Sequence, residues 1–174
     1  MMQLRPIPLT AQCFEQFGQV VELAELEHYA QQISINHGLT TRFHDLLTID
    51  ANDQGGRPIV NVFRTSPIPL PHKVKVMERH PLGSQGFIPM CDQPFLVLVG
   101  RTSGRIEERL DFDDLILFLT NGRQGINIKK NTWHHFQIVL NNTQDFIVID
   151  RAGDGDNLEE IEVEDDVWIG ALTW

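Results

Sequence analysis

One short segment of the chain has residue types and spacing that suit chemistry. It reads Glu78-x-His80-x4-Gln85, with a Pro-Leu-Gly-Ser turn before the glutamine, and a further histidine, His134, follows much later. Carboxylate and imidazole groups hold divalent cations and also transfer protons, whereas glutamine is a weaker metal ligand. All four residues are candidate metal ligands, and Glu78, His80 and His134 are the candidate catalytic residues. The site is predicted to be either a divalent metal centre or a metal-free, hydrogen-bonded polar network.

The pattern around these residues places them in an apolar interior. Side chains of a strand alternate between its two faces, so the face that begins with Val74 and Val76 continues into Glu78 and His80. In the later segment, the same alternation puts His134 on the more apolar face. Burying such groups is costly unless they are paired or bound to something. We therefore expect the two segments to line one cavity.

The elements that must position this cavity are short and mostly extended. A short helix is predicted over residues 11–17, with Thr10 as its N-cap, and a polar, turn-prone stretch follows over residues 33–50. Beyond it, runs rich in Val, Ile and Phe alternate with turn residues, which predicts an all-β sandwich or barrel. The predicted strands are Ile59–Arg64, Lys73–His80, Gly86–Met90, Phe95–Gly100, Leu115–Thr120, Trp133–Leu140 and Asp145–Asp150.

Charge and length indicate one domain over residues 1–174 with an acidic and apolar tail, residues 152–174. Most of the formal net charge of −10 comes from residues 150–166, and the remainder is nearly balanced. Nucleic acid is therefore not expected as a partner, because phosphate binding needs a basic surface. The apolar residues of the tail are expected to pack either back on the domain or across a dimer contact.

The sequence also indicates where the protein works. It has no run of about 18 apolar residues, so no membrane span is expected. Its first residues lack the apolar core of a secretory signal, and Cys13 and Cys91 form no paired motif. We therefore expect a cytoplasmic protein that binds a small molecule and no membrane.

A twelve-residue block carries a family resemblance. Residues 78–89, Glu-Arg-His-Pro-Leu-Gly-Ser-Gln-Gly-Phe-Ile-Pro, resemble the signature of bacterial ureidoglycolate lyases, long called hydrolases. The block stands where the first cupin motif has His-x-His-x4-Glu, and residues 131–134 stand where the second cupin motif delivers its single histidine. The resemblance covers residues 4–162 and implies a cupin-type double-stranded β-helix, or jelly-roll barrel. Further matching pieces lie at residues 35–38, 42–46, 120–125, 133–135 and 145–151.

The resemblance also implies an activity. Members of this family cleave (S)-ureidoglycolate to glyoxylate and urea, a carbon–nitrogen (amidine-lyase) reaction of allantoin degradation, purine metabolism and nitrogen utilisation. A homodimer and a divalent metal, with nickel as the candidate, are implied as well. The chain departs from the family in two places, with Ile128-Lys129-Lys130 where members have Tyr-His and Phe136 where a proline is usual.

An anionic substrate needs residues beyond the four already named. The planar fork of arginine matches a carboxylate, so Arg64, which continues the Val60–Val62 face, and Arg42, in the polar stretch, are candidates. Asn36 is a candidate for the ureido group, and Gln85 is a candidate for substrate binding as well as for metal.

Two alternatives stay open from the sequence. One is a different enzyme on the same fold, such as an isomerase, epimerase or dioxygenase of small hydroxy or keto acids. The other is a non-catalytic cupin that binds a small acid. An absolute need for oxygen would indicate the dioxygenase, and ligand-induced stabilisation without product would indicate the binding module.

Overall fold

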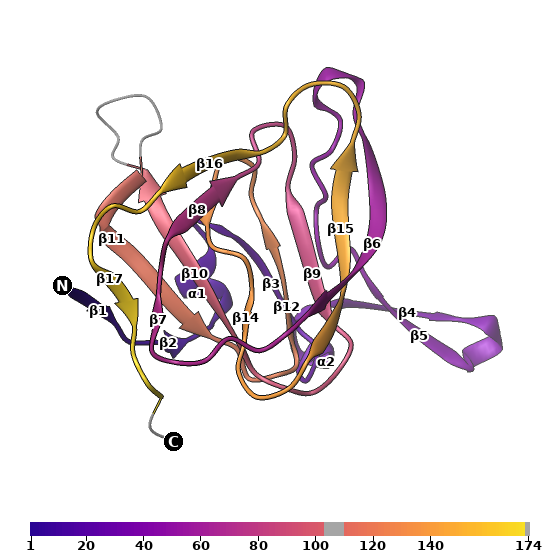
Figure 1. Ribbon diagram of the computed structural model, residues 1–174. Helices are drawn as coiled ribbons and strands as arrows, with labels where there is room; N and C mark the ends of the chain where they lie inside the picture. Colours follow the sequence, from indigo (N-terminus) through magenta and orange to yellow (C-terminus); the bar gives the residue numbers. More distant parts are fainter. Residues whose placement is uncertain (103–109, 173–174) are drawn as a thin grey trace.

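Two β-sheets face each other and form a barrel, which confirms the predicted all-β, cupin-type fold (Figure 1). The structure is a computed structural model that describes residues 1–102 and 110–172. Sheet I consists, in spatial order, of β16 (Glu159–Glu162), β8 (Val76–Arg79), β13 (Trp133–His134), β10 (Phe95–Thr102), β11 (Leu110–Leu119) and β2 (Ile7–Pro8), with β14 (Ile138–Val139) also paired to β10. Sheet II consists of β3 (Gly18–Glu22), β12 (Gln124–Ile128), β9 (Gln85–Pro89), β15 (Gln144–Ala152) and β6 (Arg57–Thr65).

The remaining elements lie around this barrel. A small third sheet consists of β1 (Met2–Leu4), β17 (Val167–Ile169) and β7 (His72–Lys73). The helical elements are α1 (Ala11–Phe14), α2 (Leu26–Tyr29), and the 3-10 turns η1 (Asn36–Gly38) and η2 (Asp53–Gly55). Helix α1 is shorter than predicted, although Thr10 caps it as expected, since its hydroxyl accepts a hydrogen bond from the Cys13 amide at 3.1 Å.

The apolar core has two layers, one on each face of β10. The inner cluster lies between the two sheets and includes Val97 and Val99 of β10 together with Phe87 and Phe146 of sheet II. The outer cluster lies on the other face of sheet I, where Leu96 and Leu98 are packed. Both faces of β10 are therefore buried. The neighbouring strands of sheet I carry site residues on the inner face and structural apolar residues on the outer face.

Two of the predicted strands are each broken into two shorter strands. Residues 73–80 form β7 and β8 with a break between them, and the predicted strand 133–140 is likewise divided into β13 and β14. At the first break the Val74 amide donates to Val167 and the Lys75 carbonyl accepts from Val163. The chain thus changes partners there, so Val74 is buried in the outer cluster and does not share a face with Glu78.

The acidic tail packs back on the barrel. Strand β16 pairs with β8, and β17 lies between β1 and β7. Val163, Val167 and Ile169 are buried in the outer cluster, while the acids between them face solvent. The tail therefore closes the outer face of sheet I, which leaves the inner face of that sheet for the site.

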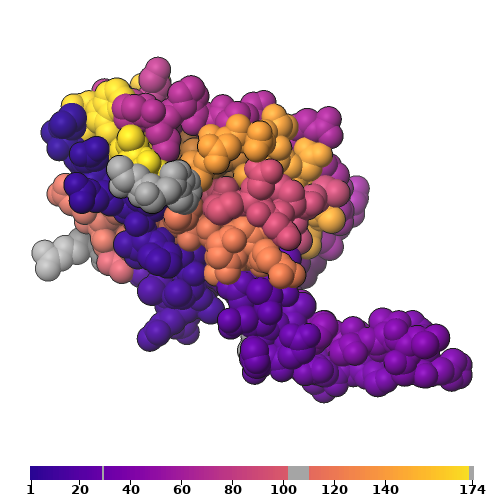
Figure 2. Space-filling model, turned by 90° about the horizontal axis from the view of Figure 1, so that it is seen from below, coloured from indigo at the N-terminus to yellow at the C-terminus, as the bar shows by residue number. Residues whose placement is uncertain are grey.

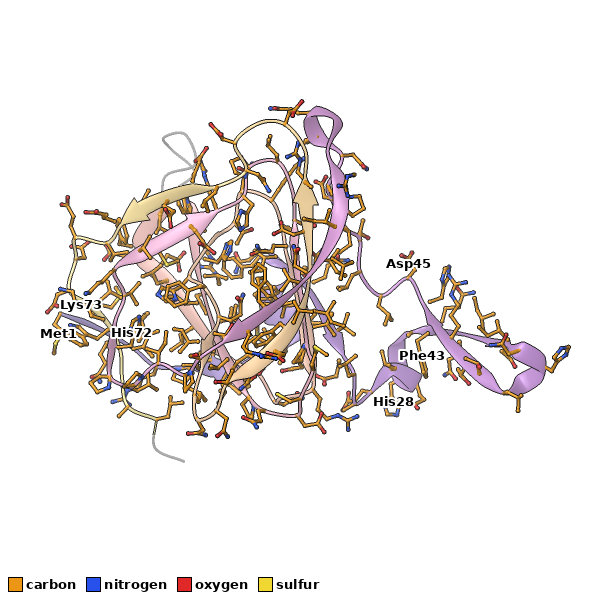
Figure 3. The ribbon with its side chains drawn as sticks, turned by 45° about the vertical axis from the view of Figure 1, so that its right-hand side comes forward. Met1, His28, Phe43, Asp45, His72 and Lys73 are labelled. Carbon is orange, nitrogen blue, oxygen red and sulfur yellow. The ribbon has the colours of Figure 1, made fainter. Side chains whose placement is uncertain are left out.

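One segment leaves the body of the molecule. Strands β4 (Gln31–Ile35) and β5 (Thr40–His44) pair with each other, and η1 joins them at the tip. We call residues 31–44 the arm. It projects well beyond sheet II in the ribbon view and stands clear of the body in the space-filling view (Figures 1 and 2). Phe43 and Asp45 mark its base in the side-chain view (Figure 3).

Candidate functional site

The predicted cavity residues Glu78 and His134 lie opposite each other on neighbouring strands. Glu78 of β8 is the register partner of His134 of β13, and His134 is in turn paired with Val99, a residue of the inner cluster. Side chains at paired positions share a face of a sheet. Both groups therefore point into the barrel, as the sequence predicted, and the His134 side chain is only 1% exposed.

His80, which directly follows β8, completes a triad. One ligand atom each of Glu78, His80 and His134 lies within 4.8 Å of the others, and the two imidazole rings have centroids 5.2 Å apart. His134 Nε2 is 3.4 Å from a Glu78 carboxylate oxygen. The structure thus brings the three candidate catalytic residues to one point inside the barrel.

The backbone sets the tautomer of both imidazoles. His80 Nδ1 lies 2.6 Å from the Asn157 carbonyl oxygen, and His134 Nδ1 lies 2.8 Å from that of Thr132. A carbonyl only accepts hydrogen bonds, so each Nδ1 carries its proton and donates it. Nε2 is then the remaining ligand atom of each ring, and both Nε2 atoms are buried with no hydrogen-bond partner among the described residues. Metal-binding histidines are held in this way, so the donor set fits a divalent cation.

The charge of the triad favours an ionised carboxylate. Burial raises the pKa of Glu78, but the adjacent His134 imidazole and, less strongly, the imidazoles of His80 and His135 outweigh that effect and hold the pKa below its usual range. Glu78 is therefore an anion at neutral pH, able to bind a cation or to accept a proton.

Gln85 faces the same interior from the opposite sheet. It is paired with Ile128 of the inner cluster and is only 5% exposed. Its side-chain nitrogen lies 3.4 Å from a carboxylate oxygen of Asp150, while its carbonyl oxygen is buried with no hydrogen-bond partner among the described residues. The carbonyl oxygen is thus available as a fourth, weaker ligand. The sequence does not indicate Asp150 as a site residue. It comes close to Gln85 only through the pairing of two strands, and such pairing produces no pattern in the residues around either position.

A second pair of imidazoles lies close by. His72 of β7, labelled in Figure 3, and His135 have ring centroids 5.4 Å apart. Burial lowers the pKa of His135 to about 4 and also lowers that of His72. His135 Nδ1 donates to the Phe136 carbonyl at 2.9 Å. Both rings are therefore neutral at physiological pH.

The structure does not bring the other predicted substrate residues to the triad of the same chain. Arg64 lies on the outer face of sheet II, where its side chain is 75% exposed and forms a two-bond ion pair with Asp145. Its face was read correctly as that of Val60 and Val62, but this face is exposed to solvent. Arg42 and Asn36 are both on the arm. Asn36 shapes the tip, with a left-handed φ of 53° and an amide hydrogen bond to the Thr40 hydroxyl.

Residues 128–130, where the sequence resemblance implies a departure, lie beside the site. Ile128 is fully buried in the inner cluster next to Gln85. Lys129 points elsewhere, since its ammonium donates to the Glu15 carbonyl at 2.6 Å, and Lys130 pairs with Asp50 and Asp53. An aliphatic side chain therefore occupies the inner wall beside Gln85.

Fold and site together define a class. A cupin-type barrel with a carboxylate and two backbone-oriented histidines inside it is typical of small-molecule enzymes of the cupin superfamily. None of the helices within the described ranges is long and apolar enough to cross a membrane.

Comparison with known proteins identifies the family. A family model described as ureidoglycolate lyase matches residues 1–170, so the chain belongs to the ureidoglycolate lyase family, a family of enzymes. It is 47% identical over 162 residues to a ureidoglycolate lyase of Burkholderia mallei, an alignment that covers 93% of this chain and 90% of the relative. Proteins of the same name from Brucella anthropi and Pseudomonas putida are 42% and 39% identical, over 91% and 88% of this chain and 88% and 87% of theirs.

Proposed function

We propose that the protein is a lyase that cleaves (S)-ureidoglycolate to glyoxylate and urea, as the names of its relatives indicate. The observation that carries this proposal is the convergence of Glu78, His80 and His134 inside the barrel. In the reaction the C2 hydroxyl loses its proton, its oxygen forms the glyoxylate carbonyl, and the C–N bond electrons pass to the urea nitrogen, which takes up a proton. The step needs no oxidant or water.

In the metal-free site, the proton transfer is assigned to Glu78 and His134. Glu78 is ionised at neutral pH and accepts the hydroxyl proton. His134 Nε2, 3.4 Å away, shares that proton with the carboxylate, and the pair delivers it to the departing nitrogen. His80 orients the substrate from the other side of the triad, because its ring is held by the Asn157 carbonyl. Gln85 binds the substrate through the same interior face.

A divalent metal fits the same residues. Glu78, His80 and His134 would hold it, with the Gln85 carbonyl as a fourth ligand, and nickel tolerates such mixed nitrogen and oxygen ligands. When bound, the ion would supply positive charge that lowers the pKa of the substrate hydroxyl and binds the carboxylate. The buried Nε2 atoms of both histidines, which lack hydrogen-bond partners among the described residues, support this assignment.

The proposal extends to the cellular setting. We infer a cytoplasmic homodimer that acts in allantoin degradation and so in purine catabolism and nitrogen utilisation. The exposed aliphatic residues of sheet II and of the arm support the dimer, since apolar patches of this kind mark interaction surfaces.

One assay tests substrate and metal together. Purified protein is stripped with a chelator, reloaded with Ni²⁺, Mn²⁺ or Zn²⁺, and given (S)-ureidoglycolate under anaerobic conditions while glyoxylate is followed. Stoichiometric glyoxylate and urea without oxygen are expected. The lyase proposal fails if no preparation yields glyoxylate or if turnover requires oxygen, and the metal proposal fails if the stripped protein is fully active.

A further inference from the structure

We propose that the arm crosses to a second copy of this chain, packs on the outer face of that copy's sheet II, and brings Arg42 to the mouth of its barrel to bind the substrate carboxylate. This inference rests on the proposed function, because it assigns a residue to the same site. The site of each copy is then completed by the arm of the other.

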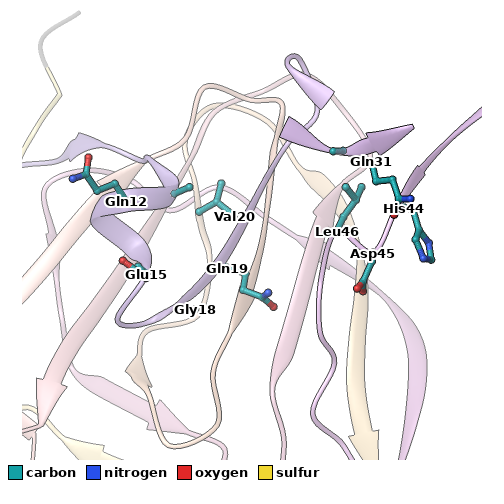
Figure 4. A pocket seen from close by; sticks show the side chains of 11 residues that line it. Gln12, Glu15, Gly18, Gln19, Val20, Gln31, His44, Asp45 and Leu46 are labelled. Atoms are coloured by element: carbon teal, nitrogen blue, oxygen red, sulfur yellow. The ribbon is translucent and has the colours of Figure 1, made fainter. Parts of the chain in front are cut away.

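The arm cannot be stable by packing on its own body. Its strands contact each other and η1 far more than any other element, and an isolated two-stranded hairpin is marginal in water. Leu39 at the tip is 88% exposed and Ile35 is 37% exposed. A cleft of about 490 Å³ separates the base of the arm from α1 and β3, as Figure 4 shows between Gln31 and His44 on one side and Gln12 and Val20 on the other. The arm therefore needs a surface that its own chain does not offer.

The same chain carries a matching acceptor surface. On the outer face of sheet II, Val60 and Val62 of β6 are 69% and 61% exposed. Their register partners on β15 are Ile149 and Ile147, and Ile147 is also paired with Ile88 of β9. These five aliphatic residues form one continuous patch. The arm leaves the body on the side of sheet II (Figure 1), so a two-fold axis beside this sheet lays each arm on the patch of the other copy.

Charge also favours a second copy as the occupant. The arm, residues 31–44, contains Arg42 and two histidines and no acidic residue, whereas the whole chain has a formal net charge of −10. A basic arm on an acidic protein is attracted to another copy's body and repelled by other basic surfaces. Ile33 and Ile35 are paired with Arg42 and Thr40, so both isoleucines share one face of the ribbon with Arg42.

The site itself calls for a cation from elsewhere. In addition to a metal, a side-chain cation would hold the substrate carboxylate, yet the cations of the segments that carry the site residues are engaged by other partners. Arg79 pairs with Glu159 on the outer side of β8, and Arg151 donates to the Asp53 and Asp154 carbonyls. Lys130 pairs with two aspartates. Arg42, by contrast, is exposed. Its guanidinium donates a hydrogen bond at 2.8 Å to Nδ1 of His44, which is also a residue of the arm.

The first test asks whether the arm forms the dimer. Light scattering of the full chain should report a dimer, and Leu39→Asp combined with Ile35→Asp should convert it to a folded monomer. Gln32→Asp, on the other face of the ribbon, is the matched control and should remain dimeric. A full chain that is monomeric, or a double variant that stays dimeric, overturns the proposal without reference to substrate.

The second test asks in which copy Arg42 acts. Arg42→Ala should raise KM roughly 10- to 100-fold with a smaller change in kcat, the loss of a charge-assisted carboxylate contact. Arg5→Ala, an exposed arginine on another part of the chain, is the control and should leave both unchanged. Arg42→Ala is then mixed and reassociated with His134→Gln, which has an intact arm and a defective triad.

If the arm acts in the partner, mixed dimers contain one site with both an intact triad and an intact arm. At subsaturating substrate the mixture should then regain about a quarter of wild-type turnover, because random reassociation makes half the dimers mixed. Turnover no greater than the sum of the two separate variants overturns the exchange of Arg42. If the wild-type protein makes no glyoxylate, the proposed substrate is refuted instead. The light-scattering result then tests only whether the arm forms the dimer.

Discussion

The two imidazole pairs of this barrel differ in what surrounds them. His80 and His134 have ring centroids 5.2 Å apart, and those of His72 and His135 are 5.4 Å apart. Among the described residues, only the first pair forms a ligand group with a carboxylate, that of Glu78. Burial keeps the second pair neutral. Proximity of two histidines is thus not what distinguishes the candidate site; an anionic partner and two converging Nε2 atoms are.

The largest expected difference between the pairs is in turnover. Glu78→Gln and His134→Gln should each lower kcat by roughly 10²- to 10⁴-fold, since each removes a proton-transfer group. His72→Gln, which also replaces an imidazole by an amide, should keep kcat within a few-fold. Glyoxylate release measures all three, and thermal unfolding confirms that each variant is folded. Similar losses in His72→Gln and His134→Gln would abolish the distinction between the pairs.

Metal affinity should separate the pairs next. His80→Ala removes one of three strong ligands and should weaken Ni²⁺ binding by roughly 100-fold or more. This loss is larger than that typical of replacing a residue that only hydrogen-bonds to a metal ligand. His72→Ala should leave the affinity nearly unchanged. Isothermal titration of the chelator-treated proteins with Ni²⁺ gives both values. A site that has lost His80 and still binds nickel normally would show that the triad is not the metal site.

The second pair should instead control stability at low pH. The pKa of His135 is about 4 in the folded protein against 6.5 in the unfolded chain, so below pH 6.5 the unfolded state binds the proton more readily. Stability is therefore unaffected above about pH 7 and falls as the pH drops towards 4. The linkage predicts a loss of about 2 kcal/mol between pH 7 and pH 5 from this residue.

Urea unfolding at the two pH values measures that loss. In His135→Gln the protein is less stable at pH 7, but the part of the pH dependence due to this ring should vanish. An unchanged difference between pH 7 and pH 5 in the variant would assign the acid sensitivity to other groups.

The sequence predicted the inner residues well but partly by a flawed route. Glu78 and His134 do face the interior, as alternation indicated. However, alternation does not run through either predicted strand, because both are broken. Ile138, four residues after His134, would share its face in an unbroken strand, but it belongs to the outer cluster because the strand ends between them. Alternation is reliable only within an unbroken strand, and a break is decided by distant partners.

The arm shows the limit of local patterns more clearly. Residues 33–50 were predicted as a polar, turn-prone stretch, yet β4 and β5 form there. Their apolar residues are few and none of them is buried, so no core-facing pattern indicates these strands in the sequence. The left-handed Asn36, His37 and Gly38, with φ of 53°, 57° and 86°, explain the turn signal at the tip. Two strands that pair with each other away from the core need no alternation of apolar and polar residues, so the sequence does not indicate them.

The smallest expected effect concerns how the first pair is held. His80 donates to the carbonyl of Asn157, a residue from a distant loop, whose side chain accepts a hydrogen bond from the Leu82 amide at 2.8 Å. His135 donates to the carbonyl of the adjacent Phe136. Asn157→Ala should therefore loosen His80 alone, lowering kcat by roughly 3- to 10-fold and stability by about 1 kcal/mol.

Asn157→Asp is the matched variant, because its carboxylate still accepts from the Leu82 amide, and it should restore most of the lost turnover. A merely structural role would lower stability in Asn157→Ala without changing the pH dependence of kcat. Orientation of His80 predicts a shifted kcat profile, because a ring released from its carbonyl acceptor changes tautomer and charge more freely. Identical pH profiles in wild type and Asn157→Ala would show that the loop does not position the imidazole.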